Sequence, residues 1–249
     1  RIKWLLKKFH VGSYPGLVWS TVGAEHEMNA DVLEAAGARL DLTPEQVGRC
    51  IESAGVGFLF ALNHHGAMKH AIGPRRELGV RTVFNLLGPL VNPLQPDAQV
   101  LGVATEDLLE PMAGALQLLG LKRAVVVHGH GGLDEASLSG TNQLMVLEDG
   151  QLRCDQLDPQ ALGLALQPID ALVGGDLACN QQILQAVLQG QGSQAQKDVV
   201  ALNTALVLWS AGQVNSWREG VQQAHDCLAS GKPWQRFEQL AAALTPVGG

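Results

Sequence analysis

Residues 98–128 contain two short apolar runs separated by a longer amphipathic stretch. The first run is AQVLGVA at residues 98–104, and the second is RAVVVH at residues 123–128. Thr105 and Gly120 bracket the stretch between them, as start and stop residues of a helix do. A strand, a helix and a strand in this order predict parallel strands joined by a right-handed crossover. This unit places the chain in the α/β class, and we expect a mainly parallel central sheet flanked by helices.

Turn and capping residues predict further elements. Thr43-Pro44-Glu45-Gln46 is a capping-box start, and it predicts a helix that Gly55 ends, followed by a strand from Val56 to Ala61. Two polar-apolar runs flank Glu148-Asp149-Gly150, which predicts a hairpin on or beside the sheet. Other helices are expected at residues 65–78, 82–87, 176–188, 195–211 and 216–230.

The sequence also predicts how the chain is divided. Residues 1–29 form an atypical N-terminal segment, because they show no period of either 2 or 3.6 and contain the only Tyr. Residues 30–97 are expected to supply part of a smaller helical domain and the substrate cleft. Residues 98–249 are expected to form the α/β domain.

The charge balance narrows the class of ligand. Lys and Arg total 17 against 24 Asp and Glu, a net charge of −7, and aromatic residues make up only 4% of the chain. A nucleic-acid binder needs a basic surface, and a single-strand binder needs aromatic stacking platforms. We therefore expect no nucleic-acid partner and a small polar ligand.

The cysteines and the apolar runs bear on location. The four cysteines, at positions 50, 154, 179 and 227, are too widely spaced for a CxxC pair and too few for a disulfide framework. They are expected to be reduced and mostly buried. No apolar run approaches the ~18 residues of a membrane-spanning helix. These features predict a cytoplasmic protein without a membrane partner.

A glycine-rich segment with two acids, Gly129 to Glu135, follows the strand RAVVVH directly. Ligands of open parallel sheets bind beyond the carboxyl ends of the strands, and glycines there allow close approach of an anion. Adjacent carboxylates suit Mg²⁺, which takes oxygen ligands and substrate phosphates. Asp134 and Glu135 are therefore candidate metal ligands. A flexible loop with two solvated acids and a helix cap is the alternative.

A second candidate is basic. Residues 64–76 hold three His, one Lys and two Arg in an otherwise acidic chain, and Arg75 offers a planar fork for a carboxylate. The spacing of His64 and His65 to His70 does not match a zinc motif. The alternative is a solvated helix face with one core His. A third segment, residues 85–93, offers a rigid turn and an apolar wall.

Taken together, four blocks resemble the anthranilate phosphoribosyltransferase family. They read HxAMKHxxxPRRELGVRTVFNLLGPLxNP, QVLGVA, HGxGGLDEASLSG, and DVVALNTALVLWSAG with a downstream REG. Their order and spacing follow the family from about Ala30 to Trp234. The resemblance rests on long motifs.

The resemblance implies transfer of a phosphoribosyl group from phosphoribosyl pyrophosphate to the amine of anthranilate, with Mg²⁺ and with release of pyrophosphate. It implies a small helical domain, a larger α/β domain and a homodimer. Arg75 is similar to the family arginine that holds the anthranilate carboxylate, and His65 and Pro89 resemble other residues of that substrate site. Asp134 and Glu135 resemble the family's metal-binding acid pair. Neither a general acid or base nor a covalent nucleophile is implied.

One part of the family pattern is missing. The family has a GTGGD phosphate loop, an NxST segment and a KHGNR run upstream, whereas Leu17 to Thr21 read LVWST at the KHGNR position. No phosphate loop is found. We expect a truncated or frame-disrupted copy of the gene whose product is impaired in phosphoribosyl transfer.

Three other readings stay open at this point. One is a non-catalytic fragment or divergent pseudoenzyme of the same fold. Another is a relative of the pyrimidine-nucleoside phosphorylases. A third is a metal-dependent hydrolase built on His128, His130 and the two acids.

Overall fold

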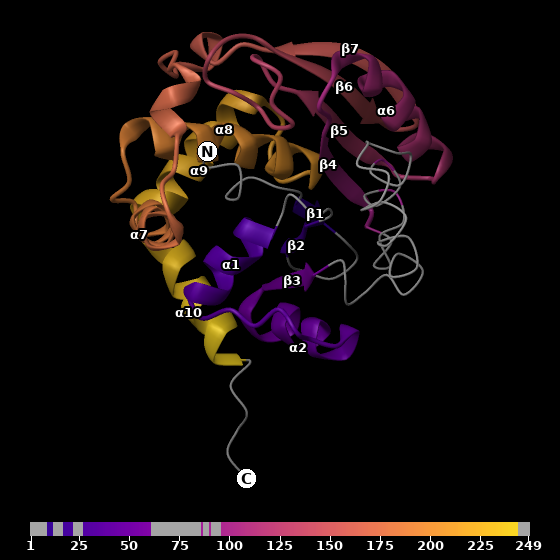
Figure 1. The fold of residues 1–249 in the computed structure, drawn as a ribbon. Helices are drawn as coiled ribbons and strands as arrows, with labels where there is room; N and C mark the ends of the chain where they lie inside the picture. Colours follow the sequence, from indigo (N-terminus) through magenta and orange to yellow (C-terminus); the bar gives the residue numbers. More distant parts are fainter. Residues whose placement is uncertain are drawn as a thin grey trace, which may run out of the picture.

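The computed structural model describes residues 9–11, 17–21, 27–60, 86, 90 and 96–243. Within them, seven strands form one sheet in the order β3-β2-β1-β4-β5-β6-β7 (Figure 1). The strands are β1 (Phe9–Val11), β2 (Leu17–Thr21), β3 (Val56–Phe60), β4 (Ala98–Gly102), β5 (Arg123–His128), β6 (Asn142–Glu148) and β7 (Gln151–Leu157). The α-helices are α1 (Glu27–Ala35), α2 (Pro44–Ala54), α6 (Leu109–Leu118), α7 (Leu177–Leu188), α8 (Gln194–Ser210), α9 (Trp217–Ala229) and α10 (Lys232–Ala243). The α/β class and the flanking helices are confirmed.

The sheet is mixed, which corrects the expectation of a mainly parallel one. Among the described strands, only β2 with β3 and β4 with β5 pair in parallel. The remaining neighbours, including β5 with β6 and β6 with β7, run antiparallel. The physical reason at one end is the hairpin turn, because a two-residue connection can join only antiparallel strands.

The strand–helix–strand unit forms with parallel strands, as the sequence predicts. β4 and β5 are parallel neighbours, with Gly102 opposite Val127, and α6 lies between them in the chain. The start of the helix differs, because a 3-10 turn at Glu106–Leu108 precedes α6 and the Thr105 side chain makes no capping hydrogen bond. Both strands therefore end at the same edge of the sheet, beside the loops that follow Gly102 and His128.

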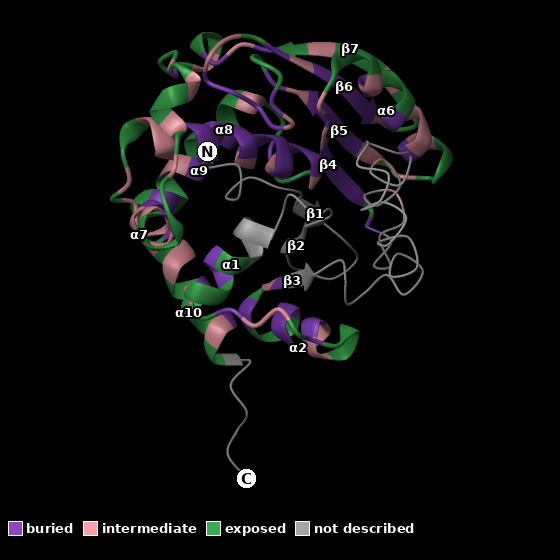
Figure 2. Ribbon diagram, viewed as in Figure 1, coloured by how far each residue is buried: buried purple, intermediate pink, exposed green. Residues whose placement is uncertain are grey.

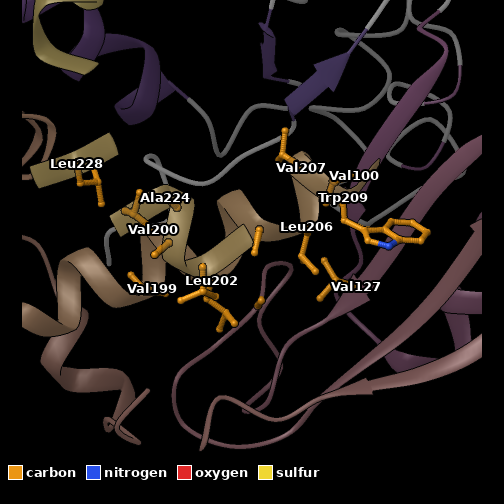
Figure 3. Close-up of a cluster of buried hydrophobic side chains, with 14 of the residues drawn as sticks. Val100, Val127, Val199, Val200, Leu202, Leu206, Val207, Trp209, Ala224 and Leu228 are labelled. Carbon is orange, nitrogen blue, oxygen red and sulfur yellow. The ribbon is translucent and has the colours of Figure 1, made fainter. Parts of the chain in front are cut away.

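Alternate residues of the central strands build two apolar layers. Val125 and Val127 of β5 pack in one cluster with α8, and Val126 between them packs in another with α6. Because successive side chains of a strand point to opposite faces, each strand contributes to both layers. Figure 3 shows the α8 layer, in which Leu206 of α8 lies next to Val127 of β5. The sheet is thus held between α6 and α8.

Helix α8 is the most deeply enclosed helix of the described residues. Eleven of its 17 residues are buried, and Figure 2 shows it between the sheet and α9. Its buried positions include Asp198 and Asn203 as well as apolar residues. Buried polar side chains need hydrogen-bond partners, so each of these two side chains must bind a polar group inside the protein.

Several local predictions are confirmed in atomic detail. Thr43 and Gln46 form the capping box of α2, and Gly55 ends the helix with φ +73°. The β6–β7 turn has Asp149 at φ +50° and Gly150 at φ +77°. Both positive angles fit a tight hairpin turn, which favours Asp-Gly. The expected helices at 65–78 and 82–87 lie outside the described residues, Leu86 apart.

A second group of helices lies to the left of and below β1 to β3 in Figure 1. Helix α10 packs against α2 and α7, and α1 packs against α7. Leu240 of α10 joins a small apolar cluster with Val47 and Ile51 of α2. The sequence reading did not anticipate β1, β2, α1 or α10. No helix of the described residues is long and apolar enough to cross a membrane.

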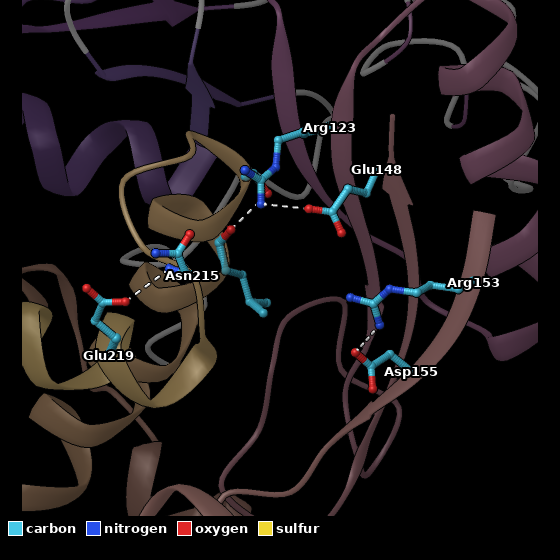
Figure 4. A network of polar contacts seen from close by, with 8 residues as sticks. Arg123, Glu148, Arg153, Asp155, Asn215 and Glu219 are labelled. Carbon is cyan, nitrogen blue, oxygen red and sulfur yellow. Dashed lines mark hydrogen bonds and ion pairs between the residues drawn. The ribbon is translucent and has the colours of Figure 1, made fainter. Parts of the chain in front are cut away.

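Arg123 links β5 to β6 and to α8. Arg123, at the start of β5, forms an ion pair of 3.3 Å with Glu148 of β6 (Figure 4) and stacks 4.1 Å from the ring centroid of Trp209. These contacts hold the end of β5 that lies opposite to the acidic loop.

Of the four cysteines only Cys50 is buried, so the expectation of mostly buried thiols is wrong.

Candidate functional site

A tight glycine turn at the carboxyl end of β5 begins the candidate site. Gly129 donates to the Leu133 carbonyl at 2.7 Å and accepts from the Leu133 amide at 3.2 Å. Gly131 and Gly132 lie between them with φ of +82° and +77°, values that side-chain-bearing residues rarely adopt. The turn therefore folds the chain back and delivers Asp134 and Glu135 to the edge of the sheet.

The backbone of the two acids lies against glycines of β4 and of the turn. A Cβ atom added to Gly102 would lie 1.6 Å from the Asp134 carbonyl oxygen, and one added to Gly129 would lie 1.9 Å from that of Glu135. No side chain fits in either place. The absence of a Cβ at both positions lets the acidic dipeptide lie directly against the strand ends.

The carboxylates differ in exposure. Asp134 is half-buried, and Glu135 is only 6% exposed. The alternative of a flexible loop with two solvated acids is therefore not what the structure contains. The residues that follow are irregular rather than helical, so the acids are not a helix cap either.

Two buried asparagines hold the segment after the acids. Asn203 of α8 accepts from the Ala136 amide at 2.9 Å and donates to the Ala136 carbonyl at 2.8 Å. Asn142 of β6 accepts from the amides of Ser137, at 2.6 Å, and His130, at 3.2 Å. Neither asparagine was singled out in the sequence, although Asn203 interrupts an apolar helical run and could have been noticed for that reason.

The imidazole rings of both histidines in the loop make hydrogen bonds within the protein. His128 donates from Nδ1 to the Val103 carbonyl at 3.1 Å, because a carbonyl oxygen can only accept. Nδ1 of His130 lies 2.9 Å from the Ser139 hydroxyl. Among the described residues, no group of three or more His, Cys, Asp or Glu could hold a metal ion. The four residues of the hydrolase reading therefore do not form such a group.

The donor set nevertheless fits Mg²⁺. Two adjacent carboxylates supply hard oxygen ligands, and Mg²⁺ commonly binds one or two carboxylates together with water and substrate phosphates. Gly132 in the turn beside them has nothing within 4 Å of the place where a Cβ would lie, and a glycine backbone of this kind can be approached by an anionic ligand. Asp134 and Glu135 are the residues of this site that could hold the ion.

The basic part of the expected site cannot be placed against these acids. His65, Arg75 and Pro89 all lie outside the described residues. Their roles as ligands of an aromatic carboxylate stay predictions from the sequence.

Comparison with known proteins identifies related chains. An anthranilate phosphoribosyltransferase of Synechococcus sp. (strain RCC307) is 84% identical over 221 residues, which cover 89% of this chain and 64% of that protein. The chain thus spans a little under two thirds of the length of this relative.

Solved structures agree in fold. The anthranilate phosphoribosyltransferase of Thermus thermophilus is 40% identical with a TM-score of 0.86, covering 98% of this chain and 72% of that one. The Saccharomyces cerevisiae enzyme in complex with PRPP and Mg is 27% identical with a TM-score of 0.79, covering 86% of this chain and 62% of that one.

A family model extends over most of the sequence. The model described as "Glycosyl transferase family, a/b domain" matches residues 20–234. The match includes β3 to α9, the glycine turn and both acids. The chain therefore belongs to this glycosyl transferase family.

Proposed function

We propose that the chain transfers a 5-phosphoribosyl group from phosphoribosyl pyrophosphate to the amine of anthranilate and releases pyrophosphate. The observation that carries the proposal is the acid pair Asp134-Glu135, fixed at the carboxyl ends of β4 and β5. The 84% identity with a Synechococcus anthranilate phosphoribosyltransferase supports this choice of donor and acceptor. The function places the protein in tryptophan biosynthesis.

Asp134 and Glu135 would hold Mg²⁺ through their carboxylate oxygens. The bound ion would offset the negative charge of the pyrophosphate as it leaves the ribose. A related yeast enzyme binds PRPP and Mg, which supports the choice of ion. The protein's own contribution is to keep the two carboxylates in place before the substrate arrives, so that no reorganisation is needed during the reaction.

The acceptor would be held by the basic segment. Arg75 would bind the carboxylate of anthranilate through two parallel hydrogen bonds, a geometry that a guanidinium fork allows and an ammonium does not. His65 and Pro89 would line the same substrate site. Orienting the weakly nucleophilic amine toward the anomeric carbon is the main task of these residues.

The reaction needs neither a strong general base nor a covalent nucleophile. The bond between the anomeric carbon and pyrophosphate breaks and leaves positive charge on the ribose. The lone pair of the neutral amine forms the new C–N bond at that carbon, and the resulting ammonium group loses its proton to water. His128 and His130 have hydrogen-bond partners at Nδ1 within the protein, and we assign them to the support of the loop rather than to proton transfer.

The proposal has further parts that follow from the family resemblance. Residues 30–97 would contribute helical-domain elements and the cleft, and residues 98–249 the α/β domain. The protein would be a cytoplasmic homodimer. Because residues 1–29 contain neither a GTGGD nor an NxST sequence, the 249 residues by themselves would transfer slowly.

The loss of anthranilate fluorescence in the presence of PRPP and Mg²⁺ tests the function. We would assay the 249-residue chain, the Synechococcus RCC307 relative, and a chimera in which residues 30–249 replace the matching part of that relative. The chimera should approach the rate of the relative, and the 249-residue chain should be at least tenfold slower. Addition of thymidine and phosphate should give no phosphorolysis in any of the three.

An inactive but folded chimera, beside an active relative, would contradict the proposed function. Phosphorolysis of thymidine would favour a nucleoside phosphorylase instead. Full activity of the 249-residue chain would leave the function standing and would refute the proposed impairment.

A further inference from the structure

The segment that carries the acid pair is held by side chains rather than by strand pairing. After the bridge between Gly129 and Leu133, residues 134–141 form no helix and no strand. A loop without a backbone ladder is usually among the less stable parts of a protein. The position of Asp134 and Glu135 must therefore be set by contacts from other elements.

Asn203 supplies the most complete of these contacts. Its Oδ1 accepts from the Ala136 amide, and its Nδ2 donates to the carbonyls of Ala136 and, at 3.0 Å, of Val199. The side chain thus binds both backbone polar groups of the residue next to Glu135. Its acceptor oxygen and both amide hydrogens are used, and 67 residues separate it from Ala136.

The surroundings of Asn203 argue against a merely local role. The side chain is 4% exposed, and its helix neighbours Leu202 and Leu206 belong to the apolar core. An apolar residue would pack here without any cost of burying an amide, whereas an amide is stable only with its partners. One bond, to Val199, lies within α8, and the two others go to the acidic loop.

The opposite side of the loop packs closely against two glycines. The Asp134 and Glu135 carbonyls lie against Gly102 and Gly129, as described above. Asn142 is completely buried and ties Ser137 to β7, since its Nδ2 donates to the carbonyls of Ser137 and Leu157. The loop is therefore enclosed between two strand ends and two asparagines.

We propose that Asn203 is a positioning residue: its amide holds Ala136 so that the carboxylates of Asp134 and Glu135 are preorganised to bind a divalent cation with the donor's pyrophosphate. The inference rests on the proposed function. Residues that orient metal ligands from behind commonly change metal affinity by ~10- to 100-fold when they are replaced. Asn203 would act through the backbone and not by touching the substrate.

Asn180 provides a matched control. It is 6% exposed in α7 and binds both backbone groups of Gly175, accepting from its amide at 3.0 Å and donating to its carbonyl at 2.9 Å. Asn180 thus binds Gly175 in the same way as Asn203 binds Ala136, but on a different loop. Asn180→Ala should therefore cost a similar amount of stability as Asn203→Ala without affecting the acids.

Amide hydrogen exchange tests whether Asn203 holds the loop at Ala136, and it requires no substrate. In the wild-type chain, the Ala136 and Ser137 amides should be protected to a degree comparable with β5. Asn203→Ala should accelerate exchange at residues 134–137 by ~10- to 100-fold, the effect of losing one or two hydrogen bonds. Asn180→Ala should accelerate exchange near Gly175 and leave residues 134–137 unchanged. Rapid exchange of both amides in the wild-type chain would overturn the proposal, even if neither variant folds.

Binding of Mn²⁺ together with PRPP, followed by electron paramagnetic resonance, tests the consequence. Asn203→Ala should weaken Mn²⁺ binding by ~10- to 100-fold, and Asn180→Ala by less than ~twofold. Equal weakening in the two variants, with normal binding by the wild type, would overturn the positioning role alone. No binding by the wild type would overturn the proposed metal site, and with it the role of Asn203 toward the metal, whatever the exchange data show of the loop.

Discussion

A Cβ atom on Gly102 would lie 1.6 Å from the carbonyl oxygen of Asp134. The last residue of β4 and the first of the two acids are thus in direct backbone contact, although they lie far apart in the sequence. The contact explains why a glycine ends β4. It also links the sheet edge to the acid pair, so a change at the strand should alter cation binding at the proposed metal site.

Gly102→Ala should displace the acidic loop, because the added methyl group overlaps a backbone atom that cannot rotate away. We expect Mg²⁺-dependent PRPP binding to weaken by at least tenfold and the protein to lose ~1–3 kcal/mol of stability from overpacking. Calorimetric titration and urea unfolding measure the two effects. Gly114→Ala, in α6 with nothing within 4 Å of the added Cβ, is the control and should be neutral or slightly stabilising. Unchanged binding in Gly102→Ala would contradict the account.

Replacing the acids singly should separate the metal site from the acceptor site. Asp134→Asn and Glu135→Gln each remove a negatively charged group that we propose as a ligand of Mg²⁺, so the Mg²⁺ concentration for half-maximal rate should rise by at least tenfold while the KM for anthranilate changes little. A titration of rate against Mg²⁺ in the chimera measures this. Asp155→Asn, whose carboxylate pairs with Arg153 on β7, serves as control. A rise in the anthranilate KM alone would assign the acids a different role.

Arg75→Ala should affect the other substrate. Loss of a bidentate pair with the anthranilate carboxylate should raise the KM for anthranilate by ~10- to 100-fold, on the scale of ~1.5–3 kcal/mol for a hydrogen-bonded charge. The KM for PRPP should stay within about twofold. Arg75→Lys should restore only part of the affinity, because an ammonium lacks the fork. Equal changes for both substrates would argue against this assignment.

Leu206→Ala should be strongly destabilising. Leu206 is fully buried between α8 and the sheet, and truncation of such a residue costs about 2–5 kcal/mol. Chemical unfolding followed by circular dichroism gives the value. Leu166→Ala, at a position 44% exposed, should change stability by no more than ~0.5 kcal/mol. A small effect at Leu206 would mean that α8 does not form the core described.

The thiols should react in two classes. Burial raises the pKa of the Cys50 thiol, and its side chain is 1% exposed, so at pH 8 both access and thiolate content are low. Cys154, Cys179 and Cys227 are exposed. Ellman's reagent should therefore modify three thiols promptly in the native protein and the fourth only on unfolding. Four thiols that react promptly in the native protein would contradict the packing of α2.

Sequence patterns that depend only on neighbouring residues predicted the corresponding turns, helices and strands correctly. The capping box at Thr43, the Asp149-Gly150 turn and the β4–α6–β5 unit depend on neighbours in the chain, and all three are confirmed. The acid pair could be placed at the end of β5 for the same reason. Its environment could not, because Asn203 and Gly102 meet it only through tertiary contacts.

The features that the sequence analysis did not predict correctly also depend on tertiary contacts or leave a weak local pattern. β1 and β2 are three and five residues long, too short to leave a clear periodic signal, and each also pairs with a strand distant in sequence, β4 and β3 respectively. The antiparallel pairing of β6 with β7 follows from the local turn, but its antiparallel pairing with β5 depends on a contact that no local pattern encodes. The exposure of Cys154 follows from the position of β7 at the sheet edge, which no local pattern encodes.

The most direct test of the account is calorimetric titration of the chain with PRPP in the presence of Mg²⁺, in the wild type and in the double variant Asp134→Asn/Glu135→Gln. We predict Mg²⁺-dependent binding by the wild type and a loss of at least tenfold in affinity in the double variant. Binding of equal strength by both proteins, or no binding by the folded wild type, would contradict the claim that these two carboxylates form the metal and pyrophosphate site.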